Sequence, residues 1–205
     1  MSVPTTRSRE NTRARLLDAA EQVFAEVGLE GATVEAVCER AGFTRGAFYS
    51  NFESKDELFL TLAASVGEAR LAAVRARVTD VIGEQSLDDC DPVDLVQRIM
   101  DSGADDRLGV MMLSEIRIRA LRDPAFGAAY LAQENEMVRG ITALIQELVD
   151  SGQITLRVEA AEAAQLLMTV WEGTTVRGAM DGDDPARLRR VGSDALGRMV
   201  ELLRA

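Results

Sequence analysis

Arg45 and Tyr49 are the side chains of this sequence whose type and spacing best suit the binding of another molecule. They stand four residues apart in the run Thr44-Arg-Gly-Ala-Phe-Tyr49. A guanidinium can donate to the acceptors of a guanine, a phenol can reach a phosphate or a base edge, and the small Ala47 can touch a thymine methyl. The segment is therefore a candidate surface for reading DNA.

Two short helices around a tight turn would hold these side chains. The first helix, predicted over 34–41, has a buried side formed by Val34, Val37, Cys38 and Ala41. Gly42 supplies the turn, and Phe48 and Phe52 anchor a second helix over 45–51. This spacing is typical of a helix-turn-helix, whose second helix enters the major groove. The alternative is a surface helical hairpin without a binding role.

Rotation by 100° per residue from Phe48 predicts the outward face of the second helix. Gly46 and Ser50 point away from the core, and Arg45 occupies one flank. Gly46 is small enough to permit close approach to a groove. Thr33 and Lys55 begin the flanking helices, where helix N-termini favour phosphate binding.

The composition limits the chemistry. The chain has 205 residues, is 47% hydrophobic and contains no His. A large core is therefore available, whereas Ser-His-Asp and Cys-His nucleophiles and His-ligated zinc are excluded. We expect no enzyme activity, no cofactor and no metal. An all-α enzyme that uses carboxylates remains the alternative, although no paired-carboxylate motif supports it.

The charge distribution also bears on DNA binding. The formal net charge is −11, and residues 1–60 hold 7 basic and 10 acidic side chains. Against this background the first 15 residues carry four arginines and one acid, namely Arg7, Arg9, Arg13, Arg15 and Glu10. Binding would therefore depend on a few placed contacts and on two copies acting together, with weak nonspecific affinity.

Helix signals dominate the whole chain, which predicts an all-α fold of about nine helices. Pro92, Pro124 and Pro185 each follow an Asp, and an N-cap Asp before Pro is a helix-start signal. We predict helices over 12–27, 34–41, 45–51, 55–82, 92–102, 107–122, 124–151, 158–181 and 185–204. We divide the chain into a flexible arm over 1–10, a helix-turn-helix domain over 11–58 and a larger helical domain over 59–205.

Several runs resemble the DNA-binding domain of the TetR family of bacterial transcriptional regulators. They are Ala19-Ala-Glu-Gln-Val-Phe-Ala-Glu-Val-Gly28, Gly31-Ala-Thr-Val34, Ala41-Gly-Phe-Thr-Arg-Gly-Ala-Phe-Tyr49 and Asn51-Phe-Glu-Ser-Lys-Asp-Glu-Leu58. Cys38 departs from the family pattern, which prefers Ala, and we interpret it as a small structural thiol. The resemblance implies base or nearby backbone contacts for Thr44, Arg45, Ala47 and Tyr49. It implies phosphate contacts for Thr33, Asn51 and Lys55.

The resemblance also implies that residues 59–205 bind a ligand and form a dimer. For the dimer we select apolar positions on the last two helices, namely Leu166, Val170, Leu188, Val191, Ala195, Leu196 and Met199. For the ligand pocket we select adaptable or aromatic side chains, namely Met100, Met111, Met112, Ile116, Phe126, Tyr130, Met137, Met168 and Trp171. Polar contacts could come from Glu115, Arg117, Arg119, Gln133 and Glu172. The alternative for both sets is ordinary packing within the domain.

The expected function is a homodimeric, ligand-responsive regulator that acts as a repressor. It would bind a palindromic operator in double-stranded DNA and leave it when a small, largely apolar effector binds. A helical protein that only sequesters a ligand is the second interpretation. Two distant Cys, no signal peptide and no long apolar run predict a cytoplasmic protein without membrane association.

Overall fold

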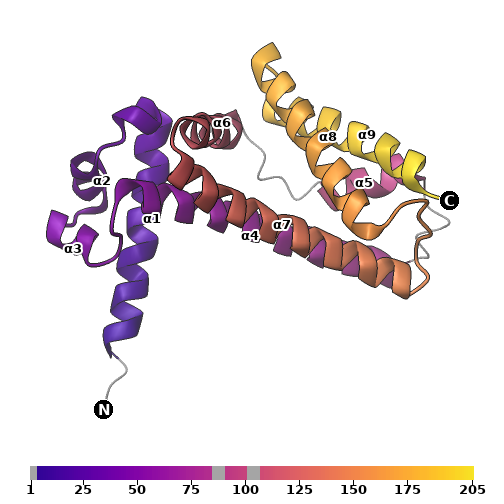
Figure 1. The fold of residues 1–205 in the computed structure, drawn as a ribbon, viewed down its shortest axis with the longest axis horizontal. Coiled ribbons are helices and arrows are strands. Elements are labelled where there is room, and N and C mark those ends of the chain that lie inside the picture. The colour runs from indigo at the N-terminus through magenta and orange to yellow at the C-terminus, as the bar shows by residue number, and fades with distance from the viewer. Residues whose placement is uncertain (1–3, 85–90, 101–106) are drawn as a thin grey trace. The chain divides into compact units, whose positions relative to one another are not determined.

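A computed structural model describes residues 4–84, 91–100 and 107–205 of the chain, with side chains omitted at 4–8, 83 and 84. The described residues form nine helices (Figure 1), and this confirms the predicted all-α class. They are α1 (Pro4–Gly31), α2 (Val34–Ala41), α3 (Arg45–Tyr49), α4 (Lys55–Glu84), α5 (Pro92–Met100), α6 (Arg107–Arg122), α7 (Pro124–Asp150), α8 (Ala160–Asp181) and α9 (Pro185–Leu203). No helix in the described ranges has the length and hydrophobicity needed to cross a bilayer.

The helices belong to two compact units. The first contains the chain up to Val66 together with Met111–Tyr130, and the second contains Gly67–Val110 and Leu131–Ala205. The boundary that we predicted after residue 58 lies inside α4. The first unit also takes in most of α6, which the sequence division had placed elsewhere.

The predicted Asp–Pro helix starts are confirmed. Asp91 Oδ1 accepts hydrogen bonds from the backbone N–H groups of Val93 and Asp94, at 2.9 and 3.1 Å. The carboxylates of Asp123 and Asp184 cap α7 and α9 in the same way. These side chains satisfy backbone donors that a helix leaves without intrahelical partners.

Helix α1 begins at Pro4 and not at the predicted residue 12, so residues 4–10 of the predicted arm form its first turns. Proline is favoured at the first helical position because its missing N–H costs nothing there, and Pro4 begins the helix. Between Pro4 and the predicted start at residue 12 there is no Gly or second Pro to interrupt the helix.

A break at Gly28 organises the first unit. Gly28 has φ 72° and ψ 178° within α1, a conformation that is essentially restricted to glycine. The backbone N–H of Leu29 donates to Glu115 Oε2 on α6 at 2.6 Å, and Leu29 O accepts from Lys55 Nζ at 2.9 Å. Arg119 Nη2 adds an ion pair to Asp56 Oδ2 at 2.9 Å. The end of α1, the start of α4 and α6 are thus joined.

Four phenylalanines form the aromatic part of the core of this unit. Phe24, Phe48, Phe52 and Phe59 are each at most 2% exposed. The rings of Phe24 and Phe59 meet edge to face with centroids 6.3 Å apart, so α1 packs on α4.

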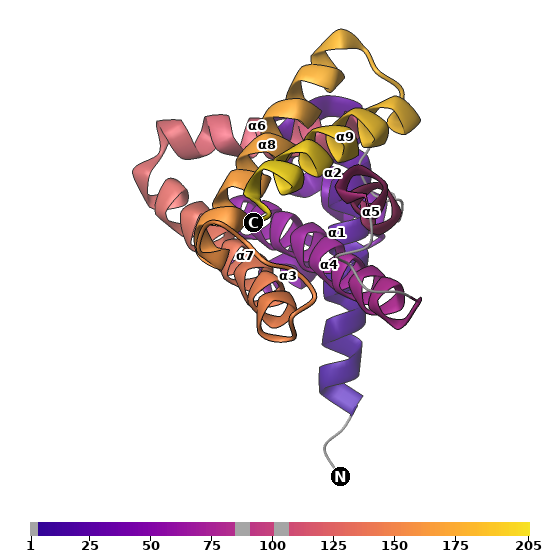
Figure 2. The same cartoon turned by 90° about the vertical axis from the view of Figure 1, so that its right-hand side faces the viewer.

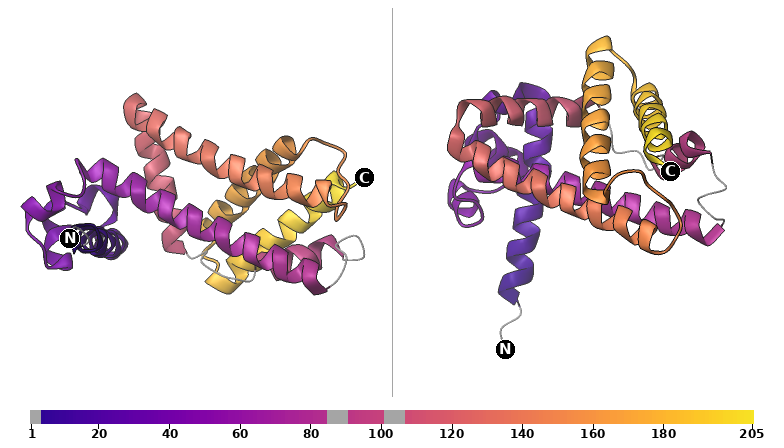
Figure 3. Two further views of the ribbon diagram at one scale, coloured as in Figure 1. Left: turned by 90° about the horizontal axis from the view of Figure 1, so that it is seen from below. Right: turned by 45° about the vertical axis from the view of Figure 1, so that its right-hand side comes forward.

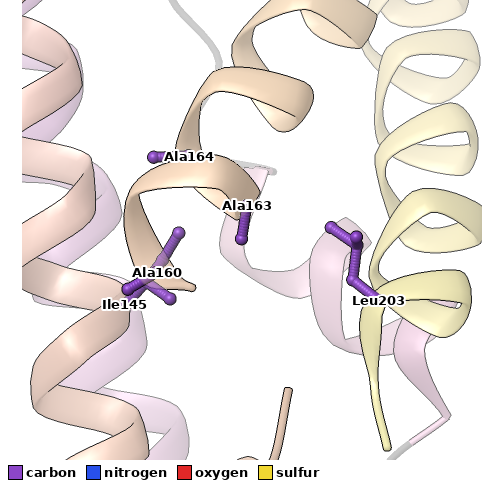
Figure 4. Packing of buried hydrophobic residues seen from close by; sticks show 5 residues of the cluster. All are labelled: Ile145, Ala160, Ala163, Ala164 and Leu203. Atoms are coloured by element: carbon purple, nitrogen blue, oxygen red, sulfur yellow. The ribbon is translucent and has the colours of Figure 1, made fainter. Parts of the chain in front are cut away.

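In the second unit, α4 and α7 lie side by side, as Figures 1 and 3 show. Leu71 packs against Gly140, and Arg75 pairs with Glu147 at 2.8 Å. Beside them, α5 and α8 both pack on α9 (Figure 2). A buried cluster in Figure 4 joins α7, α8 and α9 through Ile145, Ala160, Ala163, Ala164 and Leu203.

Replacing Gly28 by Ala should destabilise the fold more than replacing Gly42 by Ala. Gly42 is left-handed at φ 71° and ψ 34°, where Ala costs about 1–2 kcal/mol. At Gly28 the conformation itself excludes Ala, and a Cβ would lie 3.3 Å from Glu115 Oε1. We expect a loss of about 2–3 kcal/mol in the free energy of unfolding, measured by urea titration. A larger loss for Gly42→Ala would contradict the importance of the Gly28 break.

Candidate nucleic-acid interface

The segment over 33–52 forms the predicted helix-turn-helix. Thr33 caps α2, and its Oγ1 accepts from the backbone N–H of Ala36 at 3.2 Å. Gly42 ends α2 in the left-handed conformation, and the N–H of Phe43 returns to Cys38 O at 2.9 Å. Thr44 then caps α3. The local signals therefore build both helices and the turn between them.

The inner side of this motif is fixed by packing. Val37 and Phe48 are fully buried, and Phe52 is 1% exposed, as the sequence pattern predicted. The rings of Phe48 and Phe52 have centroids 5.7 Å apart. This packing determines which side of the five-residue α3 faces outward.

The outward side of α3 agrees with the rotation analysis. Arg45, Gly46 and Ser50 are exposed, Tyr49 is half exposed and Ala47 is half-buried. A Cβ added at Gly46 would lie 3.7 Å from Thr44 Oγ1, an ordinary van der Waals distance, so the outer side of the helix is uncrowded there. The surface thus combines a small centre with polar edges, which suits close approach to a groove.

Arg45 has a partner that sequence reasoning missed. Its Nη1 lies 2.8 Å from Glu35 Oε1 on α2, and the two side chains are 62% and 59% exposed. The Arg45 guanidinium carbon also lies 5.9 Å from the centroid of the Tyr49 ring. Tyr49 first, and the Glu35 carboxylate second, raise the pKa of Arg45. The sequence signal was an acid in the first turn of α2, where it also suits the helix dipole.

Two residues that we assigned to phosphates are engaged within the fold. Asn51 is 8% exposed, and its Nδ2 donates to Ala47 O at 2.8 Å, so the structure does not present it to DNA. Lys55 is half-buried, and its Nζ donates to Leu29 O. The Asn51 assignment came from the family resemblance and the Lys55 assignment also from its place at a helix start, whereas both side chains satisfy nearby backbone groups.

Two of the four N-terminal arginines also bind backbone oxygens of the motif. Arg13 Nη1 donates to Asn51 O at 2.6 Å, and its guanidinium lies 4.1 Å from the centroid of the Phe52 ring. Arg15 Nη2 donates to Ala41 O at 2.8 Å. Arg9 is exposed. Two of the three N-terminal arginines whose side chains are described therefore stabilise the motif through cation–π contacts and charge-assisted hydrogen bonds.

Comparisons with known proteins match this geometry. Residues 16–62 match the family described as bacterial regulatory proteins, tetR family, and residues 93–201 match the BetI-type transcriptional repressor C-terminal family. The HTH-type transcriptional repressor AcnR of Corynebacterium glutamicum is 30% identical over 174 residues, which cover 84% of this chain and 85% of AcnR. The chain belongs to the TetR family. The resemblance stated from the sequence is thereby confirmed, and the protein is a helix-turn-helix transcriptional regulator.

Solved structures of TetR-family proteins share the fold. A TetR transcription regulator from Haloarcula marismortui has a TM-score of 0.70 at 17% identity, with coverage of 96% of this chain and 100% of that one. The transcriptional regulator FadR from Bacillus subtilis, in complex with stearoyl-CoA, has a TM-score of 0.62 at 17% identity, with coverage of 91% and 97%.

The structure divides the predicted pocket residues of this TetR-family chain between its two units. Met111, Met112, Ile116, Phe126 and Tyr130 lie in the first unit, and Met100, Met137, Met168 and Trp171 lie in the second. Among the suggested polar contacts, Glu115 and Arg119 are engaged with Leu29 and Asp56. An open groove of about 560 Å³ lies along α8. Glu172, one of the suggested polar contacts, lines it, whereas none of the nine predicted apolar or aromatic pocket residues does.

The predicted dimer residues also differ in their surroundings. Leu188 and Leu196 are 1% and 8% exposed within the single chain, because α9 packs on α8 and α5, and they have little surface left for a partner. Leu166 is 37% exposed. The remaining four, Val170, Val191, Ala195 and Met199, are half-buried.

Cys38 should react slowly with thiol reagents. It is 4% exposed, and burial first and Glu35 second raise its pKa above the ordinary 9.0. Below pH 9.0 the thiol is neutral in both the folded and the unfolded chain. As the pH rises from there toward the folded pKa, the unfolded chain ionises first, so the free energy of unfolding falls. In a Cys90→Ser background, alkylation at pH 8 should be at least about tenfold slower than in urea. Equal rates in the two conditions would show that the thiol is accessible.

Proposed function

We propose that this regulator is a homodimeric repressor that binds a palindromic operator and leaves it when a small effector binds. The observation that carries the proposal is the exposed face of α3, held outward by the burial of Phe48 and Phe52. Two such faces related by a twofold axis would meet successive major grooves about 34 Å apart.

Each α3 would read bases through a small set of side chains. Arg45 donates to guanine, Tyr49 reaches a base edge or phosphate, and Ala47 touches a thymine methyl. Thr33 and Thr44 each use the hydroxyl oxygen to accept a capping bond, so the hydroxyl proton can be donated to a phosphate. Gly46 allows the helix to approach closely.

Selection of bound duplexes from a random DNA pool tests the proposal. The purified wild-type chain should enrich an inverted repeat at moderate salt. The double substitution Arg45→Ala and Tyr49→Ala should weaken binding to the recovered duplex at least tenfold, since a bidentate base contact is worth about 1–3 kcal/mol. Arg40→Ala is the matched control, because Arg40 is an exposed arginine of α2 with an ion pair to Glu26 and no assigned DNA contact.

Unchanged affinity in the double variant would contradict the assigned contacts. Failure of the wild-type chain to enrich any sequence, before and after unfolding, dialysis and refolding to remove a bound ligand, would favour the sequestering alternative.

The dimer would form through an exposed apolar stripe on α8. Leu166, Thr169, Gly173, Val176 and Met180 follow the three–four spacing of one helix face. Met180 is 79% exposed, and the last four of these residues border the groove along α8. Val170 of α8 and Val191, Ala195 and Met199 of α9 stay in the proposal as half-buried neighbours of this stripe. We no longer propose Leu188 and Leu196, because the single chain buries them.

Val176→Glu should produce monomers and abolish operator binding at concentrations where the wild type binds. Burying a carboxylate between two α8 helices costs desolvation energy, and the twofold axis would bring two such charges together, where they repel each other. Sedimentation velocity gives the oligomeric state. Ala143→Glu, at an exposed position of α7, adds the same charge elsewhere and should remain dimeric. A dimeric Val176→Glu variant would rule out this stripe as the interface.

The effector is proposed to be small and largely apolar. The solved FadR structure contains stearoyl-CoA, which carries a long acyl chain. In the second unit of this chain, Met100, Met137, Met168 and Trp171 are half-buried and adaptable. Gln133 Oε1 is buried in the described structure without a hydrogen-bond partner, so a ligand donor could satisfy it. Release of the selected duplex by added acyl compounds tests this assignment, and DNA must weaken effector binding by the same factor.

A further inference from the structure

A carboxylate lies within the surface proposed to meet DNA. Glu35 Oε1 pairs with Arg45 Nη1 at 2.8 Å, and more than half of each side chain is exposed. Phosphates repel a carboxylate, so Glu35 lowers the affinity for any duplex unless a hydrogen-bond donor on the DNA meets it. In the major groove those donors are the amino groups of cytosine N4 and adenine N6.

The pair also fixes how Arg45 is presented. A guanidinium has five N–H donors in a planar fork, and Glu35 Oε1 lies against Nη1 alone. The Nε–Nη2 edge carries two parallel N–H groups, which match guanine N7 and O6. Glu35 and Arg45 belong to different helices, which the buried side chains of α2 and α3 hold together. The ion pair therefore restricts the conformations of the long Arg45 side chain before DNA binds.

We propose that Glu35 is a specificity-determining residue of this interface: it orients Arg45 toward guanine and accepts a hydrogen bond from the amino group of a neighbouring cytosine or adenine. The proposal rests on operator binding by α3. On the correct sequence the donor offsets the repulsion of Glu35, and on other sequences the repulsion remains. Glu35 thus increases the difference in affinity between the correct sequence and other sequences, while it lowers the affinity for DNA in general. Specificity then comes from weaker binding to the wrong sequences.

A simpler account treats the pair as an ordinary surface ion pair. Such pairs contribute little to stability and have no effect on base choice. The two accounts differ in what removal of the carboxylate does to sequence preference, which a purely structural role would leave unchanged.

The test compares full-length wild type with Glu35→Gln, Glu35→Asp and Glu26→Gln. Glu26→Gln is the matched control, because it breaks another exposed ion pair of the same unit, between Glu26 and Arg40 at 2.7 Å. Each protein is put through the random-duplex selection. Dissociation constants are then measured by fluorescence anisotropy for the duplex recovered with wild type and for a scrambled duplex, with thermal unfolding as the check on folding.

Glu35→Gln should bind the scrambled duplex more tightly, and its ratio of scrambled to selected dissociation constants should fall about tenfold. Its preference should relax at the guanine and its neighbour in each half-site. Glu35→Asp keeps the charge but is shorter, so it should lose the same preference. Glu26→Gln should behave as wild type.

Three results would overturn the inference. Wild-type preference and ratio in Glu35→Gln would make the pair an ordinary surface ion pair. A full ratio in Glu35→Asp beside a loss in Glu35→Gln would attribute the effect to charge alone and remove the assigned hydrogen bond. No enriched sequence with wild type would instead overturn operator binding, and with it this role of Glu35.

Discussion

The backbone of Leu29 is the constraint on which the first unit depends. Gly28 interrupts α1 immediately before Leu29, a residue that is only 8% exposed, so its polar backbone groups need partners. Glu115 accepts from its N–H and Lys55 donates to its C=O, and both bonds involve a charged group. The break therefore connects α1, α4 and α6 at one point. Because α2 begins at Val34, shortly after this point, the position of the helix-turn-helix follows from it.

The same use of charged side chains explains why the DNA surface is sparsely charged. Arg13 and Arg15 bind backbone oxygens of the helix-turn-helix, and Lys55 binds Leu29 O. These cations stabilise the helix-turn-helix and its neighbouring helices, so they contribute less to attracting DNA. On the outward side, Arg45 is partly neutralised by Glu35. In a chain of net charge −11, such a surface gains little from phosphates in general and depends on the match between its few donors and the bases.

Local signals predicted the elements well, whereas partners distant in sequence could not be predicted. The N-caps Asp91, Asp123 and Asp184 and the turn at Gly42 act within a few residues, and the structure confirms them. The partners of Asn51 and Lys55 within the fold could not be predicted because they depend on how α1, α3 and α4 pack, and the Glu35–Arg45 pair joins separate helices for the same reason. The contacts with bases themselves remain predictions.

The last two helices show why periodicity alone cannot identify an interface. Leu188 lies on a three–four stripe, yet the chain buries it itself, while the stripe ending at Met180 is left exposed. Burial within a single chain therefore distinguishes apolar side chains that belong to the core of the domain from those that are still available for contact with a partner. This matters for DNA binding, because two weak half-sites joined rigidly bind far more tightly than either alone. A surface with few cations gains sequence specificity when a second copy is held in place, so the proposed dimer face of α8 would strengthen the binding that we propose for α3.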